Sequence, residues 1–222
     1  MIRVLLVEDE QKLREIVRDY FTAHGLTCDL AADGEEALEA LSFQDYDAIL
    51  LDIMMPRLDG FTTCREIRKQ SAVPILFLTA LGGEEEMLHG YALGADDYIP
   101  KPFSLAVLLA KTRAIVQRTR GTPGGEALTC GVITVDGTAQ RCTVAGEPVR
   151  LTTGELELLT CLLRHKGQTL SRAQLLDLVW GLDFTGDDRA VDVRIRSLRA
   201  ALGPAGQQIH TVYRAGYRME AE

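Results

Sequence analysis

Features of exported and membrane proteins are missing from this sequence. Its five cysteines form no CxxC pair, and their odd number and scattered positions argue against a disulfide framework or a zinc site and favour a reducing compartment. No stretch approaches the ~20 apolar residues that span a bilayer. The first apolar run, residues 2–7, is followed at once by Glu8, Asp9 and Glu10, which is not the pattern of a signal peptide. We therefore expect a cytoplasmic protein that does not associate with membranes.

An excess of positive charge is also missing, because the chain carries a formal net charge of -8. The acidity is uneven: residues 1–120 contain 20 acidic and 13 basic side chains, whereas residues 121–222 contain 12 and 11. Four of the arginines in the second part fall within residues 189–199. Since a polyanion responds to local clusters of basic residues, the overall charge does not exclude nucleic-acid binding by the second part.

The segment RTRGTPGGEA, residues 118–127, interrupts the chain. Pro123 and three glycines fit poorly inside a helix or a strand, which is typical of a short flexible linker. A length of 222 residues is enough for two small domains. We therefore expect one domain over residues 1–118, a linker over 119–127 and a second domain over 128–222.

Strand and helix patterns alternate before the linker. Short apolar runs typical of buried strands occur over residues 2–7, 28–32, 48–52, 74–79 and 98–99. Segments with helical periodicity follow them over residues 11–24, 34–41, 61–69, 84–93 and 104–118. Five such units predict an α/β doubly wound, parallel five-stranded sheet with helices on both faces, and they leave the strand order open.

The pattern changes after the linker. Residues 127–151 contain short alternating segments separated by turn residues, which predicts a small antiparallel sheet. Helices are predicted over residues 153–164, 172–179 and 188–202, the second with Ser171 as its N-cap. Two strand-like pieces, residues 208–212 and 216–219, end the chain. This order predicts an α+β winged helix-turn-helix domain.

Five polar residues stand at the carboxyl ends of the predicted parallel strands, where open α/β sheets bind their ligands: Glu8, Asp9, Asp52, Thr79 and Lys101. Three carboxylates close together repel one another unless a cation joins them, and oxygen ligands without histidine or cysteine favour Mg²⁺. A lysine and a hydroxyl suit the oxygens of a phosphoryl group, and an aspartate can be the nucleophile that accepts it. Any one of these residues alone fits a solvated loop edge better, but five in one sheet favour a site.

Motifs in the first domain carry a resemblance to a known family. LLVEDE, LLDIMMPRLDGF, FLTA and GADDYIPKPF occur in this order, and residues 2–118 resemble the receiver domain of bacterial response regulators. The resemblance implies that Asp52 accepts a phosphoryl group from a sensor histidine kinase and that Thr79 and Lys101 contact the phosphoryl oxygens. It implies further that Mg²⁺ is held by Glu8, Asp9, Asp52 and the backbone carbonyl of Met54.

Tyr98 matches the switch aromatic of the same family, which turns inward when Thr79 moves towards the phosphate. The alternative for Tyr98 is simple half-burial in an edge strand. Lys101-Pro102 stands where the family places a cis peptide bond, and the sequence leaves its isomer open.

The second domain carries a resemblance of its own. LTTGELELLTCLLRHKGQTLSRAQLLDLVWG, RAVDVRIRSLRAALG and TVYRAGYRM resemble the winged-helix effector domain of the OmpR/PhoB class over residues 128–219. Residues 188–202 then form the recognition helix, whose apolar stripe consists of Val191, Ile195, Leu198 and Leu202. Its arginine-bearing face can enter the major groove, although a solvated basic face is the alternative. The expected DNA contacts are Arg172, Arg189, Arg194, Arg196, Arg199 and Arg214, and Trp180 is expected in the core.

Two positions depart from the pattern of the class. The wing usually reads R-G-x-G-Y, whereas this chain has YRAGY over residues 213–217, so that Arg214 is displaced by one residue. The displacement argues against minor-groove reading by Arg214 from the strand and leaves a role from the turn open. Arg194 stands where many members have histidine. The class therefore does not define the DNA sequence recognised by this chain.

Regulators of this class dimerise through the fourth helix, fifth strand and fifth helix of the receiver, typically with lysine–glutamate and aspartate–arginine pairs. The first pair corresponds here to Met87 and Val107, which are both apolar, and the second to Asp97 and Lys111. We expect a hydrophobic contact to replace one salt bridge in a phosphorylation-dependent homodimer. The alternative is that Met87 and Val107 pack within their own domain. RNA polymerase would be a further partner of such a transcription factor.

Two other functions fit parts of the sequence. A phosphatase or hydrolase with an aspartate nucleophile would need a second acid as general acid, but Asp52 is followed by Ile53 and Met54. A DNA-binding regulator that works without phosphorylation would have lost the acid pocket, whereas all of its residues are present here. The sequence therefore predicts a transcription factor rather than an enzyme that turns over an external substrate.

Overall fold

The computed structural model describes residues 1–80, 83–119, 127–181 and 188–221. The chain divides into two compact units, Met1–Thr119 and Arg120–Glu222, which are described separately below. Most of the expected linker, residues 120–126, lies outside the described residues.

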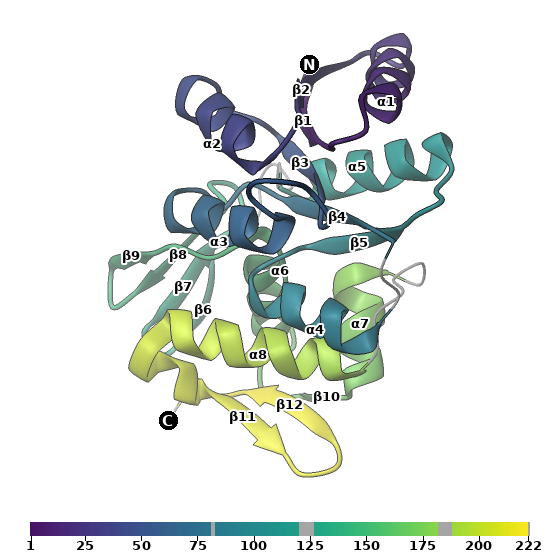
Figure 1. Ribbon diagram of the computed structural model, residues 1–222. Coiled ribbons are helices and arrows are strands. Elements are labelled where there is room, and N and C mark those ends of the chain that lie inside the picture. Colours follow the sequence, from purple (N-terminus) through teal and green to yellow (C-terminus); the bar gives the residue numbers. More distant parts are fainter. Residues whose placement is uncertain (81–82, 120–126, 182–187, 222) are drawn as a thin grey trace. The chain divides into compact units, whose positions relative to one another are not determined.

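The first unit is a parallel sheet covered by helices on both faces. Its strands are β1 (Ile2–Val7), β2 (Leu26–Ala31), β3 (Ala48–Asp52), β4 (Ile75–Thr79) and β5 (Asp97–Pro100). Its helices are α1 (Gln11–Ala23), α2 (Gly34–Phe43), α3 (Gly60–Gln70), α4 (Glu84–Ala92) and α5 (Leu105–Thr119). Figure 1 shows α1 and α5 on one face of the sheet and α2, α3 and α4 on the other. The predicted doubly wound fold is confirmed.

The strand order, which the sequence left open, is β2-β1-β3-β4-β5. The order reverses between β1 and β3, so that the chain leaves these two neighbouring strands towards opposite faces of the sheet. Ligands of doubly wound sheets bind at this switch point, outside the carboxyl ends of the strands. Glu8 and Asp9 follow β1, and Asp52 ends β3. The topology therefore brings the three acids to one place.

The central strands explain why this sheet forms. Every residue of β3 and of β4 is buried, as expected for strands that helices cover on both faces. On one face, Val4 and Leu50 pack in a cluster with Phe21 of α1 and Leu108 of α5. At the amino ends of β4 and β5, the buried Asp96 accepts hydrogen bonds from the Ile75 amide (2.9 Å) and from Arg68 (3.0 Å). This pair fixes the entry of β5 beside β4.

The second unit is a winged helix-turn-helix domain, as predicted. A four-stranded antiparallel sheet comes first, with β6 (Leu128–Cys130), β7 (Ile133–Asp136), β8 (Arg141–Val144) and β9 (Glu147–Val149). Helices α6 (Thr153–Arg164), α7 (Arg172–Trp180) and α8 (Asp188–Leu202) follow, with the short strand β10 (Thr169–Leu170) between the first two. A 3-10 turn η1 (Gly203–Gln208) leads to β11 (Ile209–Val212) and β12 (Gly216–Met219). The last two strands form the wing.

Local sequence features fix the ends of these elements. Ser171 caps α7 in a reciprocal capping box with Gln174, which confirms the predicted cap. Thr152 and Glu155 form the same device at the start of α6. In the wing, a Cβ on Gly216 would overlap the backbone carbonyl of Leu170. Only glycine therefore lets β12 approach β10 this closely.

All five cysteines are buried and free. None of the described helices is long and apolar enough to cross a membrane.

Candidate functional site

Three carboxylates converge at the carboxyl edge of the parallel sheet. One oxygen from each of Glu8, Asp9 and Asp52 can be chosen so that all lie within 4.8 Å of one another. Glu8 and Asp52 are buried, with 1% and 3% of their surface exposed, whereas Asp9 is exposed. This donor set, rich in oxygen and open on one side, fits a hard divalent cation such as Mg²⁺.

Lys101 joins the two buried carboxylates. Its ammonium Nζ lies 2.6 Å from Glu8 Oε2 and 2.7 Å from Asp52 Oδ2. Burial lowers the pKa of the Lys101 ammonium, but its hydrogen bonds to Asp52 and Glu8 outweigh burial and raise the pKa above its ordinary value. The ammonium is therefore held in its charged form next to Asp52.

The surroundings of the Glu8 carboxyl favour its neutral form. Burial raises its pKa, the hydrogen bond to Lys101 lowers it in part, and the nearby charge of Asp52 raises it again, so that the pKa stays above its ordinary value. At this edge of the sheet three carboxylates surround the single ammonium of Lys101 among the described residues. The excess of negative charge is a second reason why the residues present suit a divalent cation.

The backbone around the acids is fixed by neighbouring residues. Arg14 of α1 donates hydrogen bonds to the carbonyls of Glu8 and Asp9. The Met54 amide donates to Asp52 Oδ1 (3.2 Å), and the Met54 side chain is exposed. A Cβ on Gly60 would overlap the Asp52 carbonyl, so that α3 can begin against β3 only at a glycine. Arg14 was missed by sequence reasoning because it acts on carbonyl groups and not on the acids themselves.

Thr79 ends β4 at the same edge of the sheet and is buried. Its carbonyl accepts a hydrogen bond from the Lys101 amide (2.7 Å), and the Lys101-Pro102 bond that follows is cis. The five residues expected at the strand ends thus lie together, contributed by β1, β3, β4 and the end of β5.

Tyr98 lies inside the first unit. It is 1% exposed, and its ring packs 5.4 Å from the centroid of Phe77 and 5.0 Å from that of Tyr91. Its hydroxyl donates to the Glu86 carbonyl of α4 (3.4 Å). The alternative of half-burial is therefore wrong: Tyr98 occupies the inward position. Gly90 of α4, which sequence reasoning also missed, provides the space for its hydroxyl.

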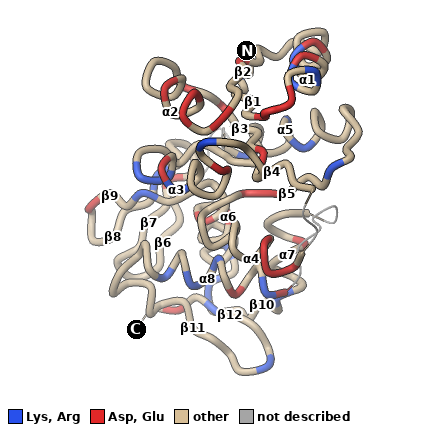
Figure 2. Tube along the Cα trace, in the orientation of Figure 1, with Lys and Arg blue, Asp and Glu red and all other residues tan. Residues whose placement is uncertain are grey.

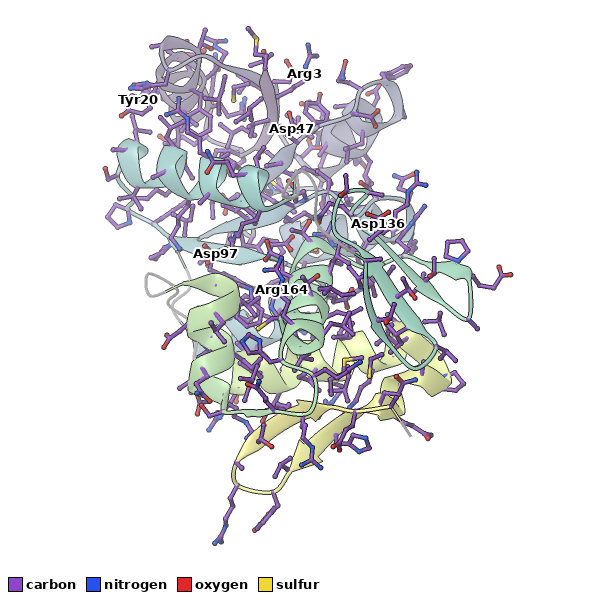
Figure 3. The ribbon with its side chains drawn as sticks, turned by 180° about the vertical axis from the view of Figure 1, so that it is seen from behind. Arg3, Tyr20, Asp47, Asp97, Asp136 and Arg164 are labelled. Atoms are coloured by element: carbon purple, nitrogen blue, oxygen red, sulfur yellow. The ribbon has the colours of Figure 1, made fainter. Side chains whose placement is uncertain are left out.

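The residues expected at a dimer interface lie on α4, β5 and α5. Val107 is 49% exposed, and Met87 is half-buried. Lys111 donates a hydrogen bond to Asp97 Oδ2 (2.7 Å) within the same chain. Asp97, which is labelled in Figure 3, is the first residue of β5. Asp97 and Lys111 are thus already paired in the single chain, while Val107 presents an apolar side chain to solvent.

Helix α8 of the second unit has the predicted apolar stripe, because Val191, Ile195, Leu198 and Leu202 are all buried. Arg189 and Arg196 are exposed on the opposite side. Figure 2 shows basic residues along α8 and at the tip of the β11–β12 hairpin. At that tip, Arg214 is exposed, has a φ of 56°, and lies 5.2 Å over the ring of Tyr213.

Arg194 corrects one expectation. We expected a DNA contact, but Arg194 is only 2% exposed and its guanidinium lies 5.0 Å over the ring of Trp180, so the prediction is wrong. Residue 194 follows Val191 by three positions and precedes Leu198 by four, which places it on the buried side of the helix. Trp180 lies in the core, as predicted.

Arg199 and Arg172 already have partners within the domain. Arg199 donates to the Ile209 carbonyl and to Thr211 Oγ1 (3.0 Å), both on β11. Arg172 donates through Nε to Asp192 Oδ1 (2.6 Å), and its side chain remains 26% exposed. Arg199 therefore holds the wing, whereas Arg172 is accessible but fixed in place.

Comparisons with known proteins cover both units. Residues 4–113 match the family described as "Response regulator receiver domain", and residues 146–219 match "Transcriptional regulatory protein, C terminal". The response regulator MprA of Mycolicibacterium vanbaalenii is 39% identical, covering 97% of this chain and 96% of the relative. The transcriptional regulatory protein YclJ of Bacillus subtilis is 35% identical over 100% of both chains.

Solved structures also resemble this chain over its whole length. A RitR mutant has a TM-score of 0.79 at 28% identity, and it covers 100% of both chains. DrrB of Thermotoga maritima, described as an OmpR/PhoB homolog, has a TM-score of 0.52 at 26% identity, also over 100% of both chains.

Proposed function

This chain belongs to the two-component response regulators that combine a receiver domain with a DNA-binding domain, and on this basis we propose that phosphorylation of Asp52 by a sensor histidine kinase controls its binding to promoter DNA. The single observation that carries the proposal is the cluster in which Lys101 bridges Glu8 and Asp52 at the switch point of the sheet. A cytoplasmic location follows from the proposal, because the kinase domain and the chromosome meet there.

Asp52 is the proposed nucleophile. One of its carboxylate oxygens attacks the phosphorus of a phosphohistidine, and the P–O bond forms as the P–N bond breaks. The histidine of the kinase, which carries a proton on its other ring nitrogen, leaves as a neutral imidazole. Lys101, 2.7 Å from Asp52, stands beside the incoming phosphoryl oxygens and supplies fixed positive charge, and the Thr79 hydroxyl supplies a hydrogen bond. Mg²⁺, held by Glu8, Asp9, Asp52 and the Met54 carbonyl, would neutralise charge on the transferring group. Loss of the phosphoryl group to water is the only turnover we propose.

The switch residues connect this pocket to the α4–β5–α5 face. The switch role proposed for Tyr98 is supported by its place: Thr79 and Tyr98 occupy neighbouring strands, and the Tyr98 hydroxyl bonds to the Glu86 carbonyl of α4. We expect phosphorylation to favour a homodimer in which Met87 and Val107 make a hydrophobic contact. The exposed side chain of Val107 supports this contact. For Asp97 and Lys111 to form a salt bridge between subunits, the hydrogen bond that joins them within one chain would have to break or be shared with the partner subunit.

The DNA-binding role is assigned to four arginines. Arg189 and Arg196 project from the exposed side of α8 towards a major groove, Arg172 would touch backbone phosphate, and Arg214 would contact DNA from the wing turn. A homodimer would present two such helices to paired half-sites. Recruitment of RNA polymerase is the proposed output at promoters.

The test is mass spectrometry of the intact protein after incubation with acetyl phosphate and Mg²⁺. We expect one phosphoryl adduct on the wild type, none on Asp52→Asn, and none on the wild type when EDTA removes the metal. Asp45→Asn, which changes an exposed aspartate remote from the pocket, is the matched control and should be modified like the wild type. A folded wild type that never gains the adduct would instead support a DNA-binding regulator that works without phosphorylation.

A further inference from the structure

Three elements of the DNA-binding domain meet at one carboxylate. Asp192 of α8 accepts a hydrogen bond from the Tyr217 hydroxyl of β12 (2.6 Å) and from Arg172 Nε at the first position of α7 (2.6 Å). Arg172 also donates to the Tyr217 hydroxyl (3.4 Å), so that the three side chains form a closed ring of contacts. Figure 1 shows the β11–β12 hairpin beside α8.

Positive charge surrounds the same tyrosine. The guanidinium of Arg172 lies 5.0 Å, and that of Arg199 5.7 Å, from the centroid of the Tyr217 ring. Arg199 follows Asp192 by seven residues and therefore lies on the same side of α8, from which it bonds to β11. One flank of the helix thus bonds to both strands of the wing. Asp192 supplies the negative charge that pairs with Arg172 on this flank.

An acid at this position needs an explanation. The Asp192 side chain is 45% exposed, and it stands on a helix whose exposed side we assign to DNA. A negative charge there opposes the approach of a polyanion. Asp192 also offsets the charge of Arg172, one of the proposed phosphate contacts. Simple electrostatics would therefore favour a neutral residue, unless the carboxylate has a positioning role that outweighs the repulsion.

We propose that Asp192 is a positioning residue for DNA binding: its carboxylate fixes Arg172 and the wing strand β12 against α8, so that helix, wing and phosphate contact reach DNA as one preformed surface. The inference rests on the proposed DNA-binding function and adds a residue that need not touch DNA itself. Preformed geometry favours binding because fewer side chains have to be ordered when the complex forms.

A positioning role of Asp192 and simple electrostatic repulsion predict opposite changes in DNA affinity when the carboxylate is removed. In fluorescence anisotropy with a labelled duplex, we expect Asp192→Ala to weaken binding by the full-length protein about tenfold, although it removes a negative charge. Asp188→Asn is the matched control, because it removes an exposed acid from the first turn of the same helix; its affinity should stay equal to the wild type or rise. Affinity of Asp192→Ala at or above the wild-type value would overturn the proposal.

Further variants keep the test independent of a folding defect. Tyr217→Phe removes the hydroxyl alone, and its effect should not add to that of Asp192→Ala, because both break the same hydrogen bond. Asp192→Asn keeps the shape of the side chain and should recover part of the lost affinity. Hydrogen exchange without DNA should be faster in β12 of Asp192→Ala than in the wild type, and unchanged exchange would also overturn the proposal. If the wild type itself binds no duplex, the proposed function fails with it, whereas failure of the positioning role leaves wild-type binding intact.

Discussion

The hydroxyl of Tyr98 occupies the space that a side chain on Gly90 would need: a Cβ built on Gly90 overlaps the tyrosine oxygen. Gly90 is buried in α4, on the helix that also accepts the hydrogen bond of this hydroxyl. The absence of a side chain at residue 90 is therefore a condition for the inward position of the proposed switch residue.

Gly90→Ala should destabilise the first domain by about 1–3 kcal/mol, because it overpacks a filled interior. The sign is informative, since glycine to alanine at an open helix position would stabilise by ~0.5–1 kcal/mol. Urea unfolding measures the change. In a Tyr98→Ala background, where the overlapping hydroxyl is gone, the same substitution should no longer destabilise; persistent destabilisation would show that Gly90 serves another purpose.

Arg196→Ala and Arg194→Ala should have opposite profiles. Loss of the exposed Arg196 should weaken DNA binding by about 1–3 kcal/mol if it contacts a base, or lower the salt slope by about 1 if it contacts a phosphate, with the melting temperature unchanged. Loss of the buried Arg194 should lower the melting temperature, because its guanidinium packs on Trp180. Anisotropy titrations at several salt concentrations and thermal melts measure both. A normal melting temperature for Arg194→Ala would contradict its assignment to the core.

Met87→Lys should weaken self-association of the phosphorylated protein, because it places an unpaired charge against the apolar Val107 of the partner subunit. Adding Val107→Glu should restore dimers by creating a salt bridge in place of the hydrophobic contact. Sedimentation velocity with acetyl phosphate and Mg²⁺ measures the dimer fraction. Equal dimerisation of Met87→Lys and the wild type would show that these residues pack only within their own domain.

The buried cysteines make stability fall at alkaline pH. Burial raises the pKa of Cys28 to about 12 and that of Cys64 and Cys142 to about 11, above the ordinary value of 9.0. Since the unfolded chain loses these protons first, their contribution to stability is complete below pH 9.0 and declines as the pH rises towards 11–12. Urea unfolding between pH 8 and 10.5 should show the decline, and replacing the three thiols by alanine should flatten it.

The thiols should also be unreactive in the native protein. Iodoacetamide at pH 8 is expected to modify the cysteines only after unfolding, because burial suppresses the thiolate. Rapid alkylation of the folded chain would contradict the buried placement of all five residues.

The first domain was well predicted because its chemistry lies at strand ends. A buried apolar run followed by an acid, as at Leu51 and Asp52, specifies both a strand and the edge at which its polar residue emerges. The order of the strands was beyond such reasoning, since the period of a strand says nothing of its neighbours. Gly90 and Arg14 were missed for a related reason: one provides space and the other binds carbonyls, so neither carries a recognisable side-chain pattern.

For the arginines of α8, helical spacing predicts burial better than the charge of the side chain does. Arg194 follows Val191 by three positions and Arg199 follows Ile195 by four, so that both lie next to the apolar stripe and turn towards the protein. A neighbouring indole ring for Arg194 and the wing for Arg199 accept their guanidinium groups. Neither partner is adjacent in sequence, so that the sequence pattern assigned both arginines to DNA.

The close approach of Gly216 to Leu170 divides the wing into a base that requires glycine and a tip whose side chains are exposed. A substitution at Gly216 would force β12 away from β10 and displace the hairpin, whereas the side chains of residues 213–215 are exposed. Substitutions at these three exposed residues are therefore expected to alter the surface that meets DNA without displacing the hairpin.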